Sequence, residues 1–112
     1  MLIKSVVIIG SGTMGSGIAA HLCNANIPVT LLDLSNDIST KARERIYKSR
    51  PPLLIDKKKI DNIKVGNIND DFDIVKEADW IVEAVVERID IKHKIYEKIF
   101  KNRKSGAIVS SN

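Results

Sequence analysis

Short apolar runs separated by polar stretches recur along this chain and predict the strands of a β-sheet. We expect strands at residues 4–9, 29–32, 62–66, 80–85 and 107–109. The run at 80–85, Trp-Ile-Val-Glu-Ala-Val, is apolar at five of its six positions. Such a run is typical of a parallel strand that is buried on both faces.

Helical periodicity fills the intervals between these strands and predicts helical segments at residues 13–24, 37–48, 53–61, 72–78 and 90–102. In the first, Met14, Ile18 and Leu22 form an apolar stripe at i, i+4 and i+8. The second has to end before Pro51 and Pro52, which cannot continue a helix. Alternating strands and helices favour an α/β fold, a Rossmann-type doubly wound sheet that is mainly parallel.

The predicted sheet is incomplete at its C-terminal side, because the chain barely completes the strand at 107–109. An open sheet edge with an uncovered face usually calls for more chain or for a partner. We therefore expect residues 1–112 to form one domain that is the N-terminal part of a longer protein.

Composition excludes several classes of protein. No apolar run approaches the roughly 20 residues of a transmembrane helix, and the N-terminal apolar stretch leads into a glycine turn, unlike a signal peptide. Cys23 is the single cysteine, which excludes disulfides within the chain and a cysteine-based zinc site. We expect a cytoplasmic protein without a metal or a membrane partner, and a buried packing role for the Cys23 thiol.

A specific motif follows the first predicted strand, where Gly10, Gly12 and Gly15 are spaced G-x-G-x-x-G. The first glycine permits a tight turn, the second admits backbone amides close to a pyrophosphate, and the third lets the helix approach the sheet. The N-terminus of that helix offers unpaired N–H groups and a partial positive charge to phosphates. We predict a dinucleotide-binding loop formed by Gly10, Ser11, Gly12, Thr13, Met14 and Gly15.

The second predicted strand leads into an acid, Asp33, eighteen residues after Gly15. Its carboxylate is placed to accept hydrogen bonds from both hydroxyls of an adenosine ribose, whereas a 2′-phosphate there would meet like charge. Leu34, Ser35 and Asn36 supply no arginine to hold such a phosphate. The predicted cofactor is therefore NAD rather than NADP, and Ser35 or Asn36 is better placed than Asp33 to cap the next helix.

Three stretches of the sequence resemble one family. They read VIIGSGTMGSGIA at residues 7–19, ADWIVEAVVER at 78–88 and SSN at 110–112, and they are similar to the NAD-binding domain of 3-hydroxyacyl-CoA dehydrogenases. The resemblance implies that Met14 lies along the pyrophosphate and that Lys92 reaches the cofactor from the helix at 90–102. It also implies that Val85, Val86 and Glu87 line the nicotinamide side.

The resembled family oxidises L-3-hydroxyacyl-CoA to 3-ketoacyl-CoA with NAD, a step of fatty-acid β-oxidation, and is commonly dimeric through a C-terminal substrate domain. The cofactor takes the hydride, and a histidine oriented by a glutamate removes the hydroxyl proton. Those positions would lie beyond Asn112, and neither His21 nor His93 matches the base by motif. The resemblance thus implies no catalytic residue in this chain, which should bind NAD without turning over substrate, and a homo-oligomeric complete protein.

A basic stretch runs from Lys41 to Lys59, with eight lysines and arginines against two acids, whereas the whole chain has a net charge of +4. In the resembled family this region contributes to the coenzyme A site, which would place Ser49 and Lys57 near CoA and its phosphates. A solvated helix face explains the same charge equally well. Two other functions stay open: another NAD-dependent dehydrogenase of a hydroxy acid or sugar acid, and a nucleic-acid-binding module. Against the latter, the stretch contains a single aromatic residue, Tyr47.

Overall fold

The computed structural model describes residues 3–85 and 89–111. Its centre is a five-stranded sheet in the order β3-β2-β1-β4-β5, in which every neighbouring pair is parallel. The strands are β1 (Val6–Ile9), β2 (Val29–Asp33), β3 (Ile63–Asn67), β4 (Trp80–Glu83) and β5 (Ile108–Ser111). Because the chain crosses from β3 back to β4 beside β1, this order confirms the doubly wound α/β fold expected from the sequence.

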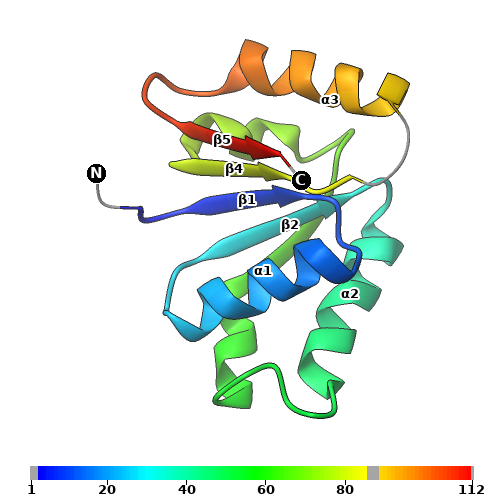
Figure 1. Cartoon of the computed structure of the whole chain (residues 1–112), viewed down its shortest axis with the longest axis vertical. Coiled ribbons are helices and arrows are strands. Elements are labelled where there is room, and N and C mark those ends of the chain that lie inside the picture. Colours follow the sequence, from blue (N-terminus) through cyan, green and yellow to red (C-terminus); the bar gives the residue numbers. More distant parts are fainter. Residues whose placement is uncertain (1–2, 86–88, 112) are drawn as a thin grey trace.

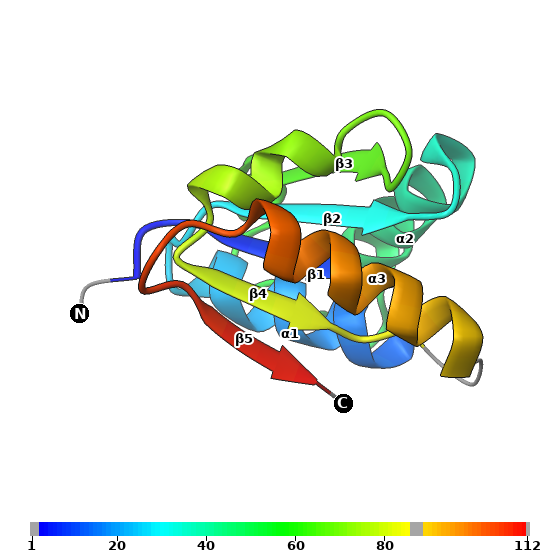
Figure 2. The ribbon, with the colours of Figure 1, turned by 90° about the horizontal axis from the view of Figure 1, so that it is seen from above.

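Helices cover both faces of the sheet (Figures 1 and 2). One face carries α1 (Thr13–Asn24), α2 (Asn36–Lys48) and the 3-10 helix η1 (Lys57–Asn62), and the other carries α3 (Ile89–Asn102) and the 3-10 helix η2 (Phe72–Glu77). Right-handed crossovers explain this division, because the chain moves one way from β1 to β3 and the opposite way from β4 to β5. Within the described ranges, none of these helices is long and apolar enough to cross a membrane.

Two hydrophobic cores, one on each side of the sheet, follow from the alternation of side chains along the strands. Val6 and Ile8 of β1 face the core beneath α1 and α2, whereas Val7 and Ile9 face the core beneath α3. All four side chains are buried. The central strand is therefore covered on both faces, as is usual for a parallel sheet.

Predicted and observed strands differ at their ends. The strand expected at 4–9 begins only at Val6, because the N–H groups of Lys4 and Ser5 donate to the carboxylate of Asp79. The strand expected at 80–85 ends at Glu83. The helix expected at 13–24 matches α1 at both ends. Hydrogen bonds to a distant side chain, which hydrophobic periodicity does not reveal, thus decide where β1 starts.

The segment between α2 and β3 departs most from the prediction. Helix α2 ends at Lys48, before the two prolines. The helix expected at 53–61 is confined to η1, and the chain that precedes it is irregular. A carboxylate oxygen of Asp56 accepts from the Lys58 N–H at 3.0 Å and caps η1. Such a cap satisfies a backbone donor that has no helical partner, and so marks the start of the helix.

Cys23 packs in the core beneath α1, as predicted. Its thiol donates to the carbonyl oxygen of Lys59 at 2.5 Å. Burial raises the pKa of this thiol, because the thiolate would lose its hydration. The side chain therefore joins α1 to η1 as a neutral group.

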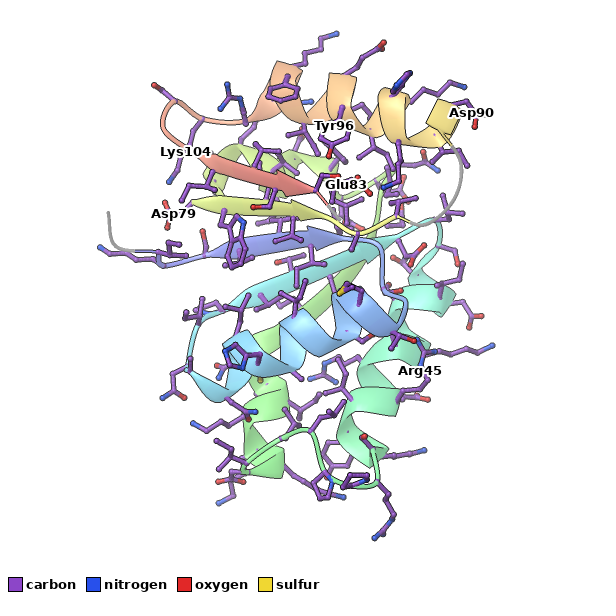
Figure 3. The ribbon with its side chains drawn as sticks, in the orientation of Figure 1. Arg45, Asp79, Glu83, Asp90, Tyr96 and Lys104 are labelled. Atoms are coloured by element: carbon purple, nitrogen blue, oxygen red, sulfur yellow. The ribbon has the colours of Figure 1, made fainter. Side chains whose placement is uncertain are left out.

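Asp79 joins the N-terminal segment to the loop before β5. Its carboxylate accepts from the N–H groups of Lys4 and Ser5 at 2.8 and 3.2 Å and from the ammonium of Lys104 at 2.5 Å. Figure 3 shows Asp79 and Lys104 together at one end of the sheet. The hydrogen bond from Lys104, followed by that from Lys4, lowers the pKa of Asp79 below its ordinary value of 3.8.

Replacing Asp79 with asparagine should lower stability at neutral pH but not in strong acid. A carboxyl group whose pKa is lowered by folding stabilises the fold above its unfolded pKa, and this stabilisation is lost as the pH falls through the folded pKa. Urea-unfolding midpoints measured at about pH 7 and about pH 2.5 test the difference.

The control is Asp73→Asn, because Asp73 is exposed and pairs with Lys76 one turn away. This exposed pair should contribute little at either pH. Equal midpoints for Asp79→Asn and the unchanged chain at neutral pH would contradict the stabilising role of the Asp79 carboxylate.

Candidate functional site

The turn between β1 and α1 requires glycine at two of the three motif positions. Gly10 has a φ of +110°, and a Cβ there would lie 2.7 Å from the carbonyl carbon of Ala84. A Cβ on Gly15 would lie 1.9 Å from the carbonyl oxygen of Gly10. Helix α1 therefore approaches its own incoming strand at a distance that only glycine permits.

Gly12 has the opposite environment, because a Cβ there would meet nothing within 4 Å. Gly12 is the N-cap of α1, and within the described residues no side chain caps this helix. Helix α2, in contrast, is capped by Ser35, whose hydroxyl accepts from the Ile38 N–H at 3.3 Å. Thr13 and Met14, both exposed, begin α1. The N–H groups of this first turn are thus left for an anionic ligand, which the open space at Gly12 can admit.

Ser11 is held at each of its polar atoms, and its exposure is 1%. Its N–H and its hydroxyl donate to the same carboxylate oxygen of Asp33, at 2.7 and 2.5 Å. Its carbonyl oxygen accepts from the hydroxyl of Ser16 at 2.9 Å and from the guanidinium of Arg45 at 3.1 Å. Side chains from α1, β2 and α2 therefore fix the glycine loop at this one residue.

Asp33 is the last residue of β2 and lies half-buried at the carboxyl edge of the sheet. Besides the two bonds from Ser11, its other carboxylate oxygen accepts from the N–H of Leu34 at 2.7 Å. A carboxylate offers about four acceptor positions, so capacity remains for one ribose hydroxyl, and a second hydroxyl would displace that of Ser11. The negative charge disfavours a phosphate at the same place.

Arg45 is a residue of this site that the sequence did not reveal. It lies on α2 (Figure 3), and the sequence placed it only within the basic stretch. Its side chain borders a hollow of about 280 Å³ between α1 and α2, lined also by Thr13, Ser16, Gly17, Ile46, Ser49 and Leu53. Only the packing of α2 beside α1 brings Arg45 to the glycine loop, so no local motif could have identified it.

Ser49 and Lys57, predicted near a CoA phosphate, make different contacts. Ser49 lines the same hollow as Arg45, and its hydroxyl donates to the carbonyl oxygen of Pro51 at 3.1 Å. The ammonium of Lys57 lies 4.8 Å from the ring centre of Tyr47. The structure thus places Ser49 beside the glycine loop, and a role for either residue in CoA binding stays a prediction.

The other half of the predicted site lies at the end of β4. Val85 is half-buried there, and Val86 and Glu87 lie outside the described residues. Lys92 on α3 forms an ion pair with Glu83, with Nζ 3.1 and 3.4 Å from the two carboxylate oxygens. Glu83 is completely buried and was not singled out from the sequence. One signal for it existed, because a charged residue inside an apolar strand rarely lacks a specific partner.

Together, the fold and this site define a class of protein. A glycine turn before an uncapped helix, with an acid at the end of the neighbouring strand, is the arrangement of a dinucleotide-binding Rossmann domain. The open space at Gly12 suits a pyrophosphate, and the remaining acceptor capacity of Asp33 suits an adenosine ribose.

Comparison with known proteins then identifies the family. Residues 5–112 match the family model described as "3-hydroxyacyl-CoA dehydrogenase, NAD binding domain", and the chain belongs to this family. The "Probable 3-hydroxyacyl-CoA dehydrogenase" of Deinococcus radiodurans is 43% identical, with 100% of this chain and 34% of that relative covered. The "Putative fatty acid oxidation complex trifunctional enzyme" of Rickettsia felis is 40% identical, with 98% of this chain and 16% of that relative covered.

A solved structure shows the same similarity. The (S)-3-hydroxybutyryl-CoA dehydrogenase PaaH1 from Ralstonia eutropha matches with a TM-score of 0.80 and 29% identity, over 99% of this chain and 41% of that one. This chain therefore spans less than half the length of each protein compared here. The family expected from the sequence, and NAD as its cofactor, are confirmed by the family match.

Substituting valine for Gly12 should prevent NADH binding while leaving the fold intact. The Cβ of the new side chain would have no protein atom within 4 Å at the N-terminus of α1, so the substitution should obstruct a pyrophosphate rather than the packing. Calorimetric titration with NADH measures the loss, and far-ultraviolet circular dichroism measures the fold.

Gly17→Val is the matched control, because Gly17 lies on the same helix and a Cβ there also meets nothing within 4 Å. This variant should bind NADH as the unchanged chain does. Retained NADH binding by Gly12→Val would remove the glycine loop from the phosphate site.

Proposed function

We propose that the protein containing this chain oxidises an L-3-hydroxyacyl-CoA to the 3-ketoacyl-CoA with NAD, as a step of fatty-acid β-oxidation. The names of the Deinococcus and Rickettsia relatives support this reaction class. The observation that carries the proposal is the uncapped N-terminus of α1 with Asp33 beside it. This arrangement provides for the phosphates and the adenosine ribose of one dinucleotide.

In this proposal the residues of the chain hold and orient the cofactor. NAD, when bound, supplies a hydride acceptor in its nicotinamide ring. The first-turn N–H groups of α1 bind the pyrophosphate, and Asp33 accepts from the adenosine ribose. Val85, Val86, Glu87 and Lys92 are assigned to the nicotinamide side on the family resemblance, which the position of β4 next to the glycine loop supports.

We assign no general base to residues 1–112. His21 lies in the last turn of α1, at the opposite end of that helix from the glycine loop, and His93 is exposed on α3. Proton removal is therefore assigned to a residue outside this stretch. We further propose that the complete protein is a cytoplasmic homo-oligomer, in keeping with the family and with a free, buried Cys23.

The acyl-CoA is proposed to lie over α2 and η1, where the basic stretch provides cations for its phosphates. Ser49 and Arg45 line the hollow beside the glycine loop, and Lys57 begins η1. A substrate held there would have its CoA portion on the same face of the sheet as the phosphates of NAD.

Replacing Asp33 with alanine should weaken NADH binding by about tenfold or more, because ribose hydroxyls lose a charged acceptor. NADPH affinity should change less, since the same substitution also removes a negative charge from the 2′-phosphate. The preference for NADH over NADPH should therefore become smaller. Calorimetric titration with both cofactors measures the ratio of their dissociation constants.

Asp37→Ala is the control, because Asp37 is an exposed acid on the next helix that pairs with Lys41. It should leave both affinities and their ratio unchanged. An unchanged preference in Asp33→Ala would exclude Asp33 from the ribose site.

The location of the substrate is tested with coenzyme A alone. Lys57→Ala should weaken saturable binding of coenzyme A several-fold, because a phosphate would lose one exposed cationic partner. Lys94→Ala, which removes an exposed lysine from α3 on the opposite face, should not. Equal affinities in the two variants would remove Lys57 from the CoA site.

A further inference from the structure

A buried carboxylate lies beside the candidate cofactor site. Glu83 has no exposed surface, and each of its oxygens has partners. One oxygen accepts from the Val85 N–H at 2.6 Å and the other from the Ser111 hydroxyl at 3.1 Å. Lys92 contacts both oxygens, and its side chain retains 23% exposure. A buried charge requires such complete pairing, because an unpaired carboxylate in a protein interior is costly.

The position of this ion pair follows from the topology. Glu83 is the last residue of β4, Ser111 is the last of β5, and Lys92 is the fourth residue of α3. Glu83 pairs in register with Ile9, the residue that precedes the glycine loop. Figure 3 shows Glu83 between the sheet and α3. The charges therefore lie at the carboxyl edge of the sheet, directly beside the loop.

This edge is divided between the two halves of a dinucleotide. Strand order places Asp33 of β2 on one side of the glycine loop and Glu83 of β4 on the other. With its adenosine ribose on Asp33 and its pyrophosphate on the N-terminus of α1, a dinucleotide extends its nicotinamide half toward β4. This step rests on the proposed function.

We infer that Glu83 is a positioning residue whose negative charge, paired with Lys92, sets the relative affinity of the site for oxidised and reduced cofactor. The nicotinamide ring carries a positive charge in NAD⁺ and none in NADH. Removing the carboxylate charge that Lys92 contacts would therefore disfavour NAD⁺ selectively, and the effect is large where protein excludes water. With Glu83 in place, the positive charge of Lys92 at the edge of the sheet lies against a buried carboxylate.

A purely structural ion pair makes a different prediction. Its loss would affect NAD⁺, NADH and ADP-ribose alike, because all three share the adenosine and pyrophosphate contacts. Only an electrostatic effect on the nicotinamide ring changes the ratio of the NAD⁺ and NADH affinities. The ratio of the NAD⁺ and NADH affinities therefore distinguishes an electrostatic role of Glu83 from a purely structural one.

The experiment measures dissociation constants of NAD⁺, NADH and ADP-ribose for Glu83→Gln by calorimetry. Glutamine is nearly isosteric and keeps an acceptor for the Val85 N–H, but leaves Lys92 charged. We expect NAD⁺ to weaken by about tenfold relative to NADH, with ADP-ribose affinity unchanged. Glu97→Gln, which neutralises an exposed acid on α3, is the control and should leave the ratio as it is.

Two further variants fix the sign. Lys92→Gln keeps a hydrogen-bond donor for Glu83 and leaves the negative charge of that carboxylate. The affinity for NAD⁺ should therefore rise relative to that for NADH. This variant tests the inference if Glu83→Gln does not fold. The double variant Glu83→Gln/Lys92→Gln removes one negative and one positive charge and should restore the original ratio.

An unchanged ratio in the single variants, with ADP-ribose still bound, would overturn the role of Glu83 and leave the cofactor site intact. Failure of the unchanged chain to bind ADP-ribose would overturn the proposed function itself, and this inference with it.

Discussion

The contact between Gly10 and Gly15 is the constraint on which the rest of the site depends. Any side chain at Gly15 would collide with the backbone that leaves β1, so α1 can start where it does only because Gly15 lacks a Cβ, and a Cβ on Gly10 would collide with the backbone of Ala84. This close approach directs the N-terminus of α1 to the carboxyl edge of the sheet. It also brings the following strand, β2, next to β1, so that Asp33 ends beside the loop.

The loop is held by protein groups before any ligand is considered. Ser11 bonds to Asp33 and to Arg45 through different atoms, and these bonds connect β2 and α2 to the turn. A site whose backbone is already fixed loses little conformational freedom when a ligand binds, which favours affinity. The same bonds have a cost, because the Ser11 hydroxyl occupies an acceptor position on Asp33 that a ribose hydroxyl would otherwise use.

Sequence patterns predicted the local part of this structure and missed the long-range part. The strands, the helix at 13–24, the glycine loop and Asp33 followed from spacing within short windows. Arg45 and Glu83 acquire their roles only when α2 reaches the loop and α3 reaches the end of β4. The prediction that β1 begins at Lys4 was wrong for the same reason, since the N–H groups of Lys4 and Ser5 donate to the carboxylate of Asp79. The roles predicted for Val86 and Glu87 at the nicotinamide side stay predictions.

The sheet also acts as a partition between two separately packed interiors. Successive residues of β1 belong to different cores, and the helices that cover those cores do not share them. A change in side-chain volume under α1 and α2 therefore meets the side chains of that core directly, and reaches the layer under α3 only through the strand backbone that both cores share. Asp33, the proposed adenosine-binding residue, lies with the first layer and the Glu83–Lys92 pair with the second. Mutational drift can consequently reshape the surface that meets one end of the dinucleotide while the other end keeps its geometry.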